Sequence, residues 1–273
     1  MKMCHLISSM LVIILAGILL SVKADAVAPL GSPGDLIQAL ESNITCGKPT
    51  MANADACRQI EEQILNSTVR IRIETWIVMP DESGYDIDFS EGHATVKDGR
   101  YLVTHNHFSV SLSIRPREGE PEAYGVVTLS NTDGETLFRG PLSDFELVWE
   151  DPETLVIAHK DDDFFEKLGF VSAEFKDWSS VPLATGIEVA QVDWNGATTR
   201  VDWAIVQEIN VEDGVPWLVL SDDVTIGASG GGVFWQGVHI AHNWLLASQL
   251  SESGALIAVT KAALNSAQVA KEG

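Results

Sequence analysis

Basic residues are scarce in this sequence. Its 273 residues contain 17 Lys and Arg against 39 Asp and Glu, which gives a formal net charge of −22 at pH 7. Nucleic acids and anionic membranes bind proteins through clusters of positive charge. The composition therefore argues against both classes of partner, while 45% hydrophobic and 21% charged residues fit a globular protein with a substantial core.

Cysteine is rarer still, with three residues and no Cys-x-x-Cys spacing of the kind that binds zinc or carries out redox chemistry. Cys4 lies in an apolar N-terminal segment, so Cys46 and Cys57 remain as a pair. In an oxidising compartment we expect these two residues to form a disulfide that closes a short loop. Two free thiols are the alternative. We predict neither a metal nor a cofactor.

The longest hydrophobic run is confined to the N-terminus. Lys2 precedes an almost unbroken apolar stretch over residues 6–20, and small residues follow at Ala24 and Ala26. This pattern predicts a signal peptide over residues 1–26 and an exported protein, located outside the cell or in the cell envelope. The run is short for a membrane-spanning helix, and an uncleaved anchor is the alternative.

The segment after the predicted signal differs from the rest of the chain. Residues 27–67 predict an N-terminal extension with short helices over Asp35–Leu40 and Asp55–Leu65, joined by the loop between the two cysteines. Apolar residues in the second helix recur at a spacing typical of one helical face. We expect this extension to pack on the main domain, residues 68–273.

The main domain has the pattern of an all-β protein. Apolar and polar residues alternate in short runs separated by turn residues, as in half-buried strands. Two groups of about six strands are predicted, over residues 68–160 and 181–259, with an acidic, irregular connection over 161–177. A helix is predicted over Thr260–Ala270. Strand counting favours two barrels but is also compatible with a sandwich.

A serine in a glycine-rich run is the main candidate for catalysis. Gly227-Ala228-Ser229-Gly230-Gly231 precedes an apolar strand. Glycines permit backbone conformations that aim successive N–H groups at one point, where they stabilise an oxyanion. A glycine-rich hairpin with a merely small serine is the alternative interpretation. The nucleophile elbow of α/β-hydrolases does not fit, because that motif requires a helix after the serine.

A serine nucleophile needs a base, and histidines end a predicted strand upstream. Val103-Thr104-His105-Asn106-His107 contains two candidates. Histidine is the usual base because its pKa lies near neutrality. A metal site made by His93, His105 and His107 is the alternative, although no second block of ligands supports it.

The histidine and serine blocks together resemble the trypsin/chymotrypsin-like serine peptidases, especially bacterial-type trypsin-like peptidase domains. The resemblance covers about residues 68–270. It implies two six-stranded antiparallel β-barrels followed by a C-terminal helix, and an exported endopeptidase that hydrolyses protein or peptide substrates. It implies His107 as base, Ser229 as nucleophile, and the N–H groups of Gly227 and Ser229 as oxyanion hole. A protease-fold binding module with impaired catalysis is the alternative function, and a lipase-like esterase a more distant one.

The third member of the implied triad is less clearly marked. The family has an acid just before a short apolar strand, and here Leu155-Val156-Ile157-Ala158 is that strand. A shift of one or two residues places Glu153 at the acid position, and we prefer it to Asp151. A carboxylate there would fix the histidine tautomer.

The resemblance also suggests residues for substrate binding and activation. Asp223 lies six positions before Ser229, a spacing that implies a carboxylate at the base of the primary pocket and a preference for Arg or Lys. Asp222 is the alternative. Asn243 and Trp244 follow the strand expected to border this pocket. Ala228 stands where the trypsin branch has an aspartate, so activation by insertion of a new N-terminus is not expected.

Overall fold

The computed structural model describes residues 45–78, 85–108, 123–212, 214–250 and 256–271. All of them belong to one compact unit, Ala39–Gly273. No helix in these segments is long and apolar enough to cross a membrane. The predicted signal peptide and the predicted helix over Asp35–Leu40 lie outside the described residues.

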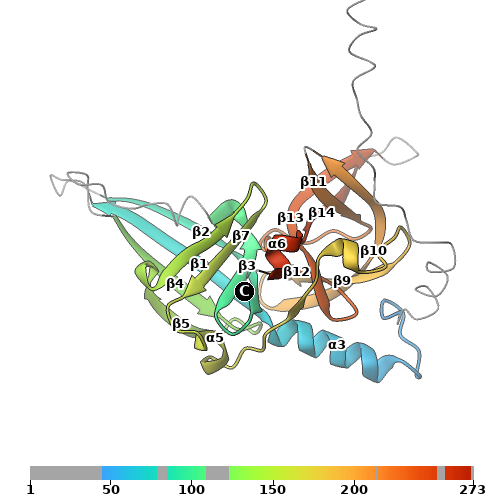
Figure 1. Ribbon diagram of the computed structural model, residues 1–273, viewed down its shortest axis with the longest axis horizontal. Coiled ribbons are helices and arrows are strands. Elements are labelled where there is room, and N and C mark those ends of the chain that lie inside the picture. Colours follow the sequence, from blue (N-terminus) through green and yellow to red (C-terminus); the bar gives the residue numbers. More distant parts are fainter. Residues whose placement is uncertain (1–44, 79–84, 109–122, 213, 251–255, 272–273) are drawn as a thin grey trace, which may run out of the picture. The chain divides into compact units, whose positions relative to one another are not determined.

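The described residues are mostly strands, as predicted (Figure 1). The strands are β1 (Thr68–Val78), β2 (Tyr85–Lys97), β3 (Tyr101–His105), β4 (Ala123–Ser130), β5 (Thr136–Pro141), β6 (Phe145–Glu150), β7 (Thr154–His159), β8 (Glu174–Phe175), β9 (Glu188–Trp194), β10 (Thr199–Glu212), β11 (Val215–Leu220), β12 (Gly232–Trp235), β13 (Val238–Leu250) and β14 (Leu256–Leu264). The helices are α3 (Ala54–Asn66), α5 (Phe164–Lys167) and α6 (Ala267–Lys271), with 3-10 turns η1 (Asn106–Phe108), η2 (Leu142–Asp144) and η3 (Trp178–Ser180).

The first sheet is antiparallel, in the order β5-β4-β1-β2-β3-β7-β6. It curls around a core of fully buried side chains that includes Val69, Ile71, Ile73, Leu102, Phe108, Leu129 and Leu155. The prediction of a two-barrel all-β fold is confirmed only in part by this half. The sheet has seven strands and remains a half-barrel, because its edge strands β5 and β6 do not pair with each other in the described residues.

The second sheet closes on itself, as predicted. Its order is β12-β9-β10-β11-β14-β13, and β12 pairs back with β13 to complete a six-stranded antiparallel barrel. A seventh strand, β8, adds to β13 in parallel. Val189, Val206, Leu218, Val233, Ile240 and Ala262 are fully buried in its core. Both β8 and the short helix α5 fall within residues 161–177, the stretch predicted to be irregular.

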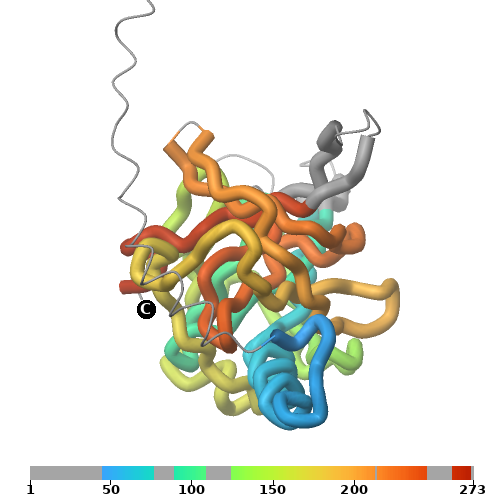
Figure 2. The backbone as a smooth tube through the Cα atoms, turned by 90° about the vertical axis from the view of Figure 1, so that its right-hand side faces the viewer, coloured from blue at the N-terminus to red at the C-terminus, as the bar shows by residue number. Residues whose placement is uncertain are grey.

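The predicted N-terminal helix and disulfide are both present. Helix α3 covers the predicted range with one extra residue at each end, and Cys46 and Cys57 are bonded with their Cα atoms 5.5 Å apart. The helix lies against β9 and β10 (Figure 2), where Ile64 is fully buried beside Ala190 and Val192. The extension therefore packs on the closed barrel.

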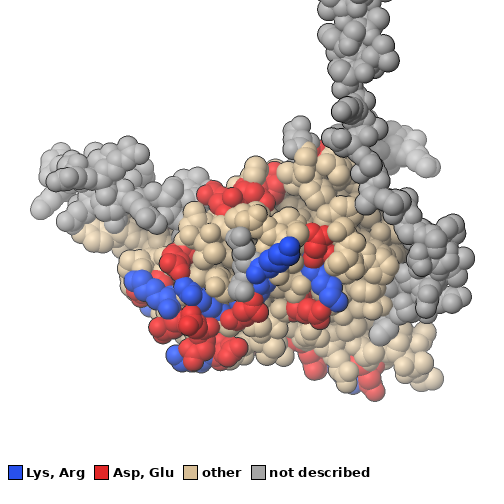
Figure 3. All heavy atoms as spheres, viewed as in Figure 1, with Lys and Arg blue, Asp and Glu red and all other residues tan. Residues whose placement is uncertain are grey.

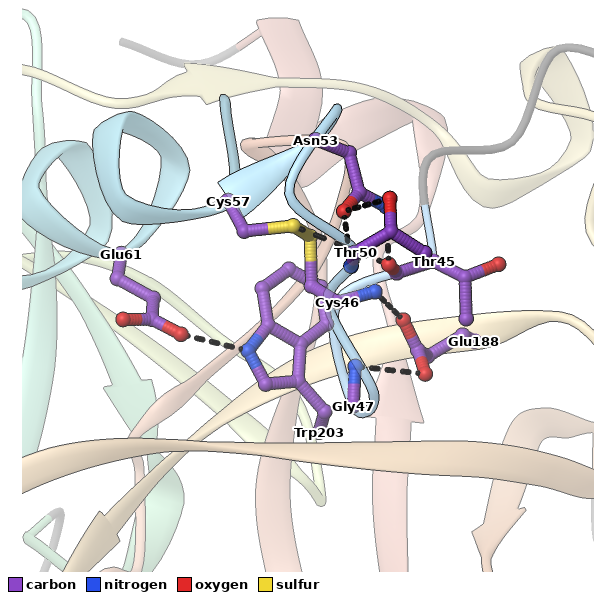
Figure 4. Close-up of a disulfide and its surroundings, with 9 residues drawn as sticks. All are labelled: Thr45, Cys46, Gly47, Thr50, Asn53, Cys57, Glu61, Glu188 and Trp203. Carbon is purple, nitrogen blue, oxygen red and sulfur yellow. Dashed lines mark hydrogen bonds between the residues drawn. A yellow bond between two sulfur atoms is a disulfide. The ribbon is translucent and has the colours of Figure 1, made fainter. Parts of the chain in front are cut away.

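Two carboxylates attach the disulfide loop and helix α3 to the closed barrel (Figure 4). Glu188 on β9 accepts hydrogen bonds from the backbone N–H groups of Cys46 and Gly47, the latter at 2.9 Å. Glu61 on α3 accepts one from the indole N–H of Trp203 on β10, at 2.8 Å.

The C-terminal helix is shorter than predicted. Residues 260–264 belong to β14, and helix α6 begins only at Ala267. The alanines in this stretch favour a helix in isolation. Pairing with β11 and β13 overrides that preference, and Ala262 and Ala263 are buried between the neighbouring strands.

The few basic side chains lie among acidic ones, as the face in Figure 3 shows. Arg100, for example, contacts Glu146 at 2.6 Å and Asp162 at 3.1 Å. Such pairing neutralises the positive charge locally.

Candidate functional site

The serine loop, residues 221–231, connects β11 to β12 in the closed barrel. Asp193 at the end of β9 anchors it, since its buried carboxylate accepts the N–H of Thr225 at 2.6 Å and is paired with Arg200 at 2.6 Å. These hydrogen bonds hold the pKa of Asp193 below its usual value, although burial alone would raise it. The carboxylate is therefore ionised at neutral pH and holds the loop.

Apolar packing supports the same loop. The Trp194 ring packs against Val224 and Ala228, and Ala228 is fully buried. The residue before Ser229 is thus part of a small apolar cluster that fixes the turn.

Glycine is required at two positions of the loop. Gly227 and Gly230 have φ values of +104° and +79°, which side chains rarely adopt. A Cβ atom on Gly230 would lie 2.1 Å from the Thr104 hydroxyl oxygen and 2.3 Å from the His93 carbonyl oxygen. The loop therefore approaches the histidine-bearing sheet through a point where only glycine fits.

Two of the four backbone N–H groups from Gly227 to Gly230 donate a backbone hydrogen bond in the described residues. The N–H of Ala228 bonds to the Thr225 carbonyl at 3.0 Å, and that of Gly230 to the Asn243 carbonyl at 2.8 Å. Within the described segments, the N–H groups of Gly227 and Ser229 donate no backbone hydrogen bond. These are the two groups predicted to form the oxyanion hole, a role that stays a prediction.

The two histidines come from the open sheet. His105 is the last residue of β3 and His107 lies in the following turn η1, which is anchored by the fully buried Phe108. Asn106 ties this turn to the β6–β7 connection, because its N–H bonds to the Glu153 carbonyl at 3.2 Å and its side chain to the Asp151 carbonyl at 2.8 Å.

Both histidines face Ser229. The Ser229 Oγ lies 3.3 Å from Nδ1 of His105 and 3.4 Å from Nδ1 of His107. His105 and His107 precede Ser229 by 124 and 122 positions and belong to the other sheet, yet both contact its hydroxyl. Catalytic hydrogen bonds are often this long without substrate and shorten when it binds. The predicted nucleophile and base are therefore brought together.

Burial determines the charge of both rings. It lowers the pKa of His107 to about 4, and burial together with repulsion from His107 and His242 lowers that of His105 to about 2. Both imidazoles are therefore neutral at pH 7, the form in which a ring nitrogen can accept a proton.

His93 has a different role from the one considered for it. Its Nδ1 lies 2.9 Å from the Gly227 carbonyl oxygen, which can only accept, so Nδ1–H is the donor. Its Nε2 accepts from the Thr199 hydroxyl at 2.8 Å. Both nitrogens are thus occupied, and in the described part of the chain no group of three His, Cys, Asp or Glu residues could hold a metal ion. The metal interpretation was wrong for His93, which joins the two sheets instead.

The two acids proposed as the third triad member differ, because Asp151 uses its carboxylate within its own turn, whereas one buried carboxylate oxygen of Glu153 has no hydrogen-bond partner in the described residues. Asp151 accepts the N–H groups of Glu153 and Thr154, at 2.8 and 2.6 Å, and so closes its own turn. Glu153 contributes its carbonyl oxygen, which accepts from Nε2 of His242 at 3.2 Å. Neither carboxylate is hydrogen-bonded to His107 in the described residues, and burial followed by repulsion from Asp151 raises the pKa of Glu153.

The predicted substrate-binding residues separate into three environments. Asp223 is exposed on the serine loop. Asn243 is buried and clamps that loop, since its N–H bonds to the Gly231 carbonyl and its side chain to the Val192 carbonyl, both at 2.8 Å. Trp244 packs edge-on against His105, with ring centroids 5.4 Å apart. Asn243 thus holds the serine loop, and Trp244 packs against one of the two histidines.

Asp193 is the residue that sequence reasoning missed. The sequence offers His105 as a candidate base or metal ligand, but it gives His105 no role once His107 is taken as the base. Asp193 could have been found from the hairpin over 192–203, because the turn at Asn195-Gly196 pairs it with Arg200 and an aspartate facing an arginine suggests an ion pair.

Comparison with known proteins found neither a matching family model nor a matching curated protein.

Proposed function

We propose that this protein is an exported serine endopeptidase in which Ser229 is the nucleophile and His107 the general base. The observation that carries the proposal is the meeting of the Ser229 hydroxyl with two neutral imidazoles, at 3.3 and 3.4 Å, beside two backbone N–H groups that donate no backbone hydrogen bond within the described residues. The resemblance of the two sequence blocks to trypsin-like peptidases supplies the substrate class, a protein or peptide.

The reaction follows from these groups. Ser229 Oγ attacks the substrate carbonyl carbon while its proton passes to His107, and the oxygen that becomes negative accepts hydrogen bonds from the N–H groups of Gly227 and Ser229. The imidazolium then gives its proton to the leaving amine. Water repeats the sequence on the acyl-enzyme and releases the acid product.

Covalent labelling tests this proposal. A fluorophosphonate probe should modify Ser229 in the mature protein, and Ser229→Ala and His107→Ala should abolish the modification. Ser180→Ala, at an exposed serine in η3, is the matched control and should label as the wild type does. A folded wild-type protein that never labels would refute the enzyme.

A binding module with impaired catalysis is the second candidate. One observation favours it, namely the absence of a hydrogen bond from Glu153 or Asp151 to His107 in the described residues. Such a protein would bind peptides, measured by calorimetry or fluorescence, with equal affinity in the wild type and in Ser229→Ala, and would not react with the probe.

A further inference from the structure

His93 on β2 holds the serine loop from the opposite sheet. Its ring Nδ1–H donates to the Gly227 carbonyl at 2.9 Å, and its backbone N–H donates to the Ser229 carbonyl at 2.8 Å. The two carbonyls lie on either side of Ala228, which is fully buried. His93 therefore binds the loop at both ends of the tripeptide that contains the proposed nucleophile.

Two hydrogen bonds fix the peptide group that joins Gly227 to Ala228. His93 bonds to its carbonyl, and the Thr225 carbonyl accepts its N–H at 3.0 Å. A peptide group is planar, so these two bonds determine its orientation. They act next to a glycine whose φ is +104°, and glycine restricts backbone rotation less than any other residue. The ring of His93 thus opposes a rotation that Gly227 itself allows.

The next peptide group that His93 binds joins Ser229 to Gly230. The backbone N–H of His93 bonds to its carbonyl, and the Asn243 carbonyl accepts its N–H at 2.8 Å. The N–H of Ser229 belongs to the peptide between these two, and the N–H of Gly227 belongs to the peptide just before them. In the described segments neither of these N–H groups donates a backbone hydrogen bond, so their direction depends on the neighbouring peptides.

We infer that His93 is a positioning residue for the oxyanion hole, because its ring holds the Gly227–Ala228 peptide and thereby the direction of the N–H groups of Gly227 and Ser229. This inference rests on the proposed function. Hydrogen bonds weaken steeply when the donor angle falls below about 120°, so rotation of this peptide would reduce the stabilisation of the substrate oxygen. His93 acts through the loop and transfers no proton.

Thr199 on β10 sets the tautomer that this role requires. The Gly227 carbonyl needs a proton on Nδ1, and a neutral ring then has its lone pair on Nε2, where the Thr199 hydroxyl donates at 2.8 Å. Burial lowers the pKa of His93 to about 4, so the ring is neutral at pH 7. The charged groups that act on the ring are Arg70, which lowers this pKa, and Asp193, which raises it.

Two substitutions of His93 separate hydrogen bonding from packing. His93→Asn keeps an N–H donor as many bonds from Cα as Nδ1 is, and its rate of fluorophosphonate labelling should stay within about tenfold of the wild type. His93→Phe keeps an aromatic ring between the sheets but has no donor, and its rate should fall by about 10²–10³, the loss that follows removal of one oxyanion-hole donor. A merely structural role predicts the opposite order, because asparagine leaves a cavity that phenylalanine fills.

His239→Phe is the matched control for packing. His239 on β13 is also a fully buried histidine, and its ring bonds to Asn265 and stacks on Phe175. In the described part of the chain no hydrogen bond joins its side chain to the serine loop. We expect His239→Phe to lower the melting temperature but to label at the wild-type rate. A rate as low as that of His93→Phe would assign the loss to a destabilised core and overturn the inference.

NMR tests the hydrogen bond without reference to activity. Glycine labelled with ¹³C at the carbonyl, combined with ¹⁵N-labelled alanine, selects the Gly–Ala peptides, which the sequence contains at 196–197, 227–228 and 254–255. The carbonyl signal of the 227–228 peptide should move in His93→Phe and stay near its wild-type position in His93→Asn, while the other two serve as references. Ala197→Ser and Ala255→Ser assign the signals. An unchanged 227–228 signal in His93→Phe would overturn the inference.

A measurement on the wild type covers the case in which His93→Phe does not fold, as judged by circular dichroism and thermal melting. Nitrogen NMR of histidine-labelled protein should show the proton of His93 on Nδ1 at pH 7, and a proton on Nε2 would overturn the inference. Equal labelling rates for folded His93→Asn and His93→Phe would also overturn it. A wild type that never labels would instead refute the proposed function, and the carbonyl and nitrogen signals would then decide whether His93 holds the loop.

Discussion

The serine loop and the histidine pair are carried by two sheets that differ in closure. The loop belongs to the barrel that closes through the β12–β13 pairing, and it is tied down by Asp193, Asn243 and the Trp194 cluster. The histidines stand at the end of a strand in the open sheet, and their partners are each other and Ser229. The nucleophile is thus fixed by its own barrel, whereas the base depends on contacts across the site.

This difference suggests that stability and reactivity depend on different residues. Stability of the serine loop should depend on residues that never touch substrate, and reactivity of the histidines should depend on neighbours within hydrogen-bond reach. Variants that weaken the closed barrel should then lose both stability and labelling, whereas changes confined to the histidines should alter labelling alone.

The largest effect is expected from Gly230→Ala. The new methyl group would meet the Thr104 hydroxyl and the His93 carbonyl, at a residue whose φ already requires glycine. We expect complete loss of probe labelling and a loss of more than about 3 kcal/mol in the free energy of unfolding. Denaturant melts would measure the latter.

Gly196→Ala is the matched control for that change. Gly196 also has a positive φ, of +93°, but nothing lies within 4 Å of the added Cβ. We expect it to cost about 1 kcal/mol and to keep its labelling rate. If both variants lost the same free energy of unfolding, the requirement for glycine at position 230 would come from its backbone conformation and not from the close contact between the sheets.

Asp193→Asn should have the next largest effect. The substitution removes the charge that holds Arg200 and weakens acceptance of the Thr225 N–H. Because Arg200 is half exposed, we expect a loss of about 2 kcal/mol, less than for a fully buried pair, together with slower labelling. Asp202→Asn, which also faces Arg200 at 2.9 Å, is the control and should cost less than about 1 kcal/mol.

Removal of the disulfide should reduce stability without affecting the chemistry. Cys46→Ser with Cys57→Ser opens a loop with a sequence separation of 11, for which about 2–3 kcal/mol is expected. Labelling of the folded fraction should not change, since the loop is hydrogen-bonded to Glu188 on β9 and, in the described residues, makes no hydrogen bond to the serine loop. Slower labelling at a temperature where the variant is fully folded would contradict this separation.

The smallest effect concerns pH. The base must be neutral, and burial places the pKa of His107 at about 4. Labelling should therefore change less than about twofold between pH 6 and pH 8, and fall only as pH drops through about 4, where the imidazole gains its proton. A rate that halves near pH 6.5 would mean that the ring titrates as if exposed to water.

Much of this fold could be predicted because short sequence patterns favour the same elements that the tertiary structure contains. The glycines around Ser229, the strand that ends in histidines, and helix α3 with its apolar stripe are local features, and each lies where it was expected. The disulfide required only two cysteines and an oxidising compartment. Closure of the second barrel was also as predicted.

What could not be predicted depends on pairing between distant segments. Residues 260–264 have helical composition, and only the neighbouring strands β11 and β13 make them a strand. Whether β5 meets β6 is decided by the curvature of the whole first sheet, which no short pattern encodes. The position of Glu153 depends likewise on Asp151 and Asn106, which bond to its backbone N–H and carbonyl and close the turn.

The N-terminal fastening has a consequence for how the chain acquires its structure. Cys46 precedes its partner Glu188 by 142 residues, and Glu61 precedes Trp203 by the same interval. At common rates of synthesis, the disulfide loop and helix α3 are therefore made roughly 7–30 s before the strands β9 and β10 on which they pack. The disulfide can form early, because both sulfurs emerge together. Helix α3, in contrast, must wait for β9 and β10, so its docking belongs to the last steps of maturation, and a nascent chain stopped before residue 188 should expose the apolar face around Ile64 to chaperones and proteases.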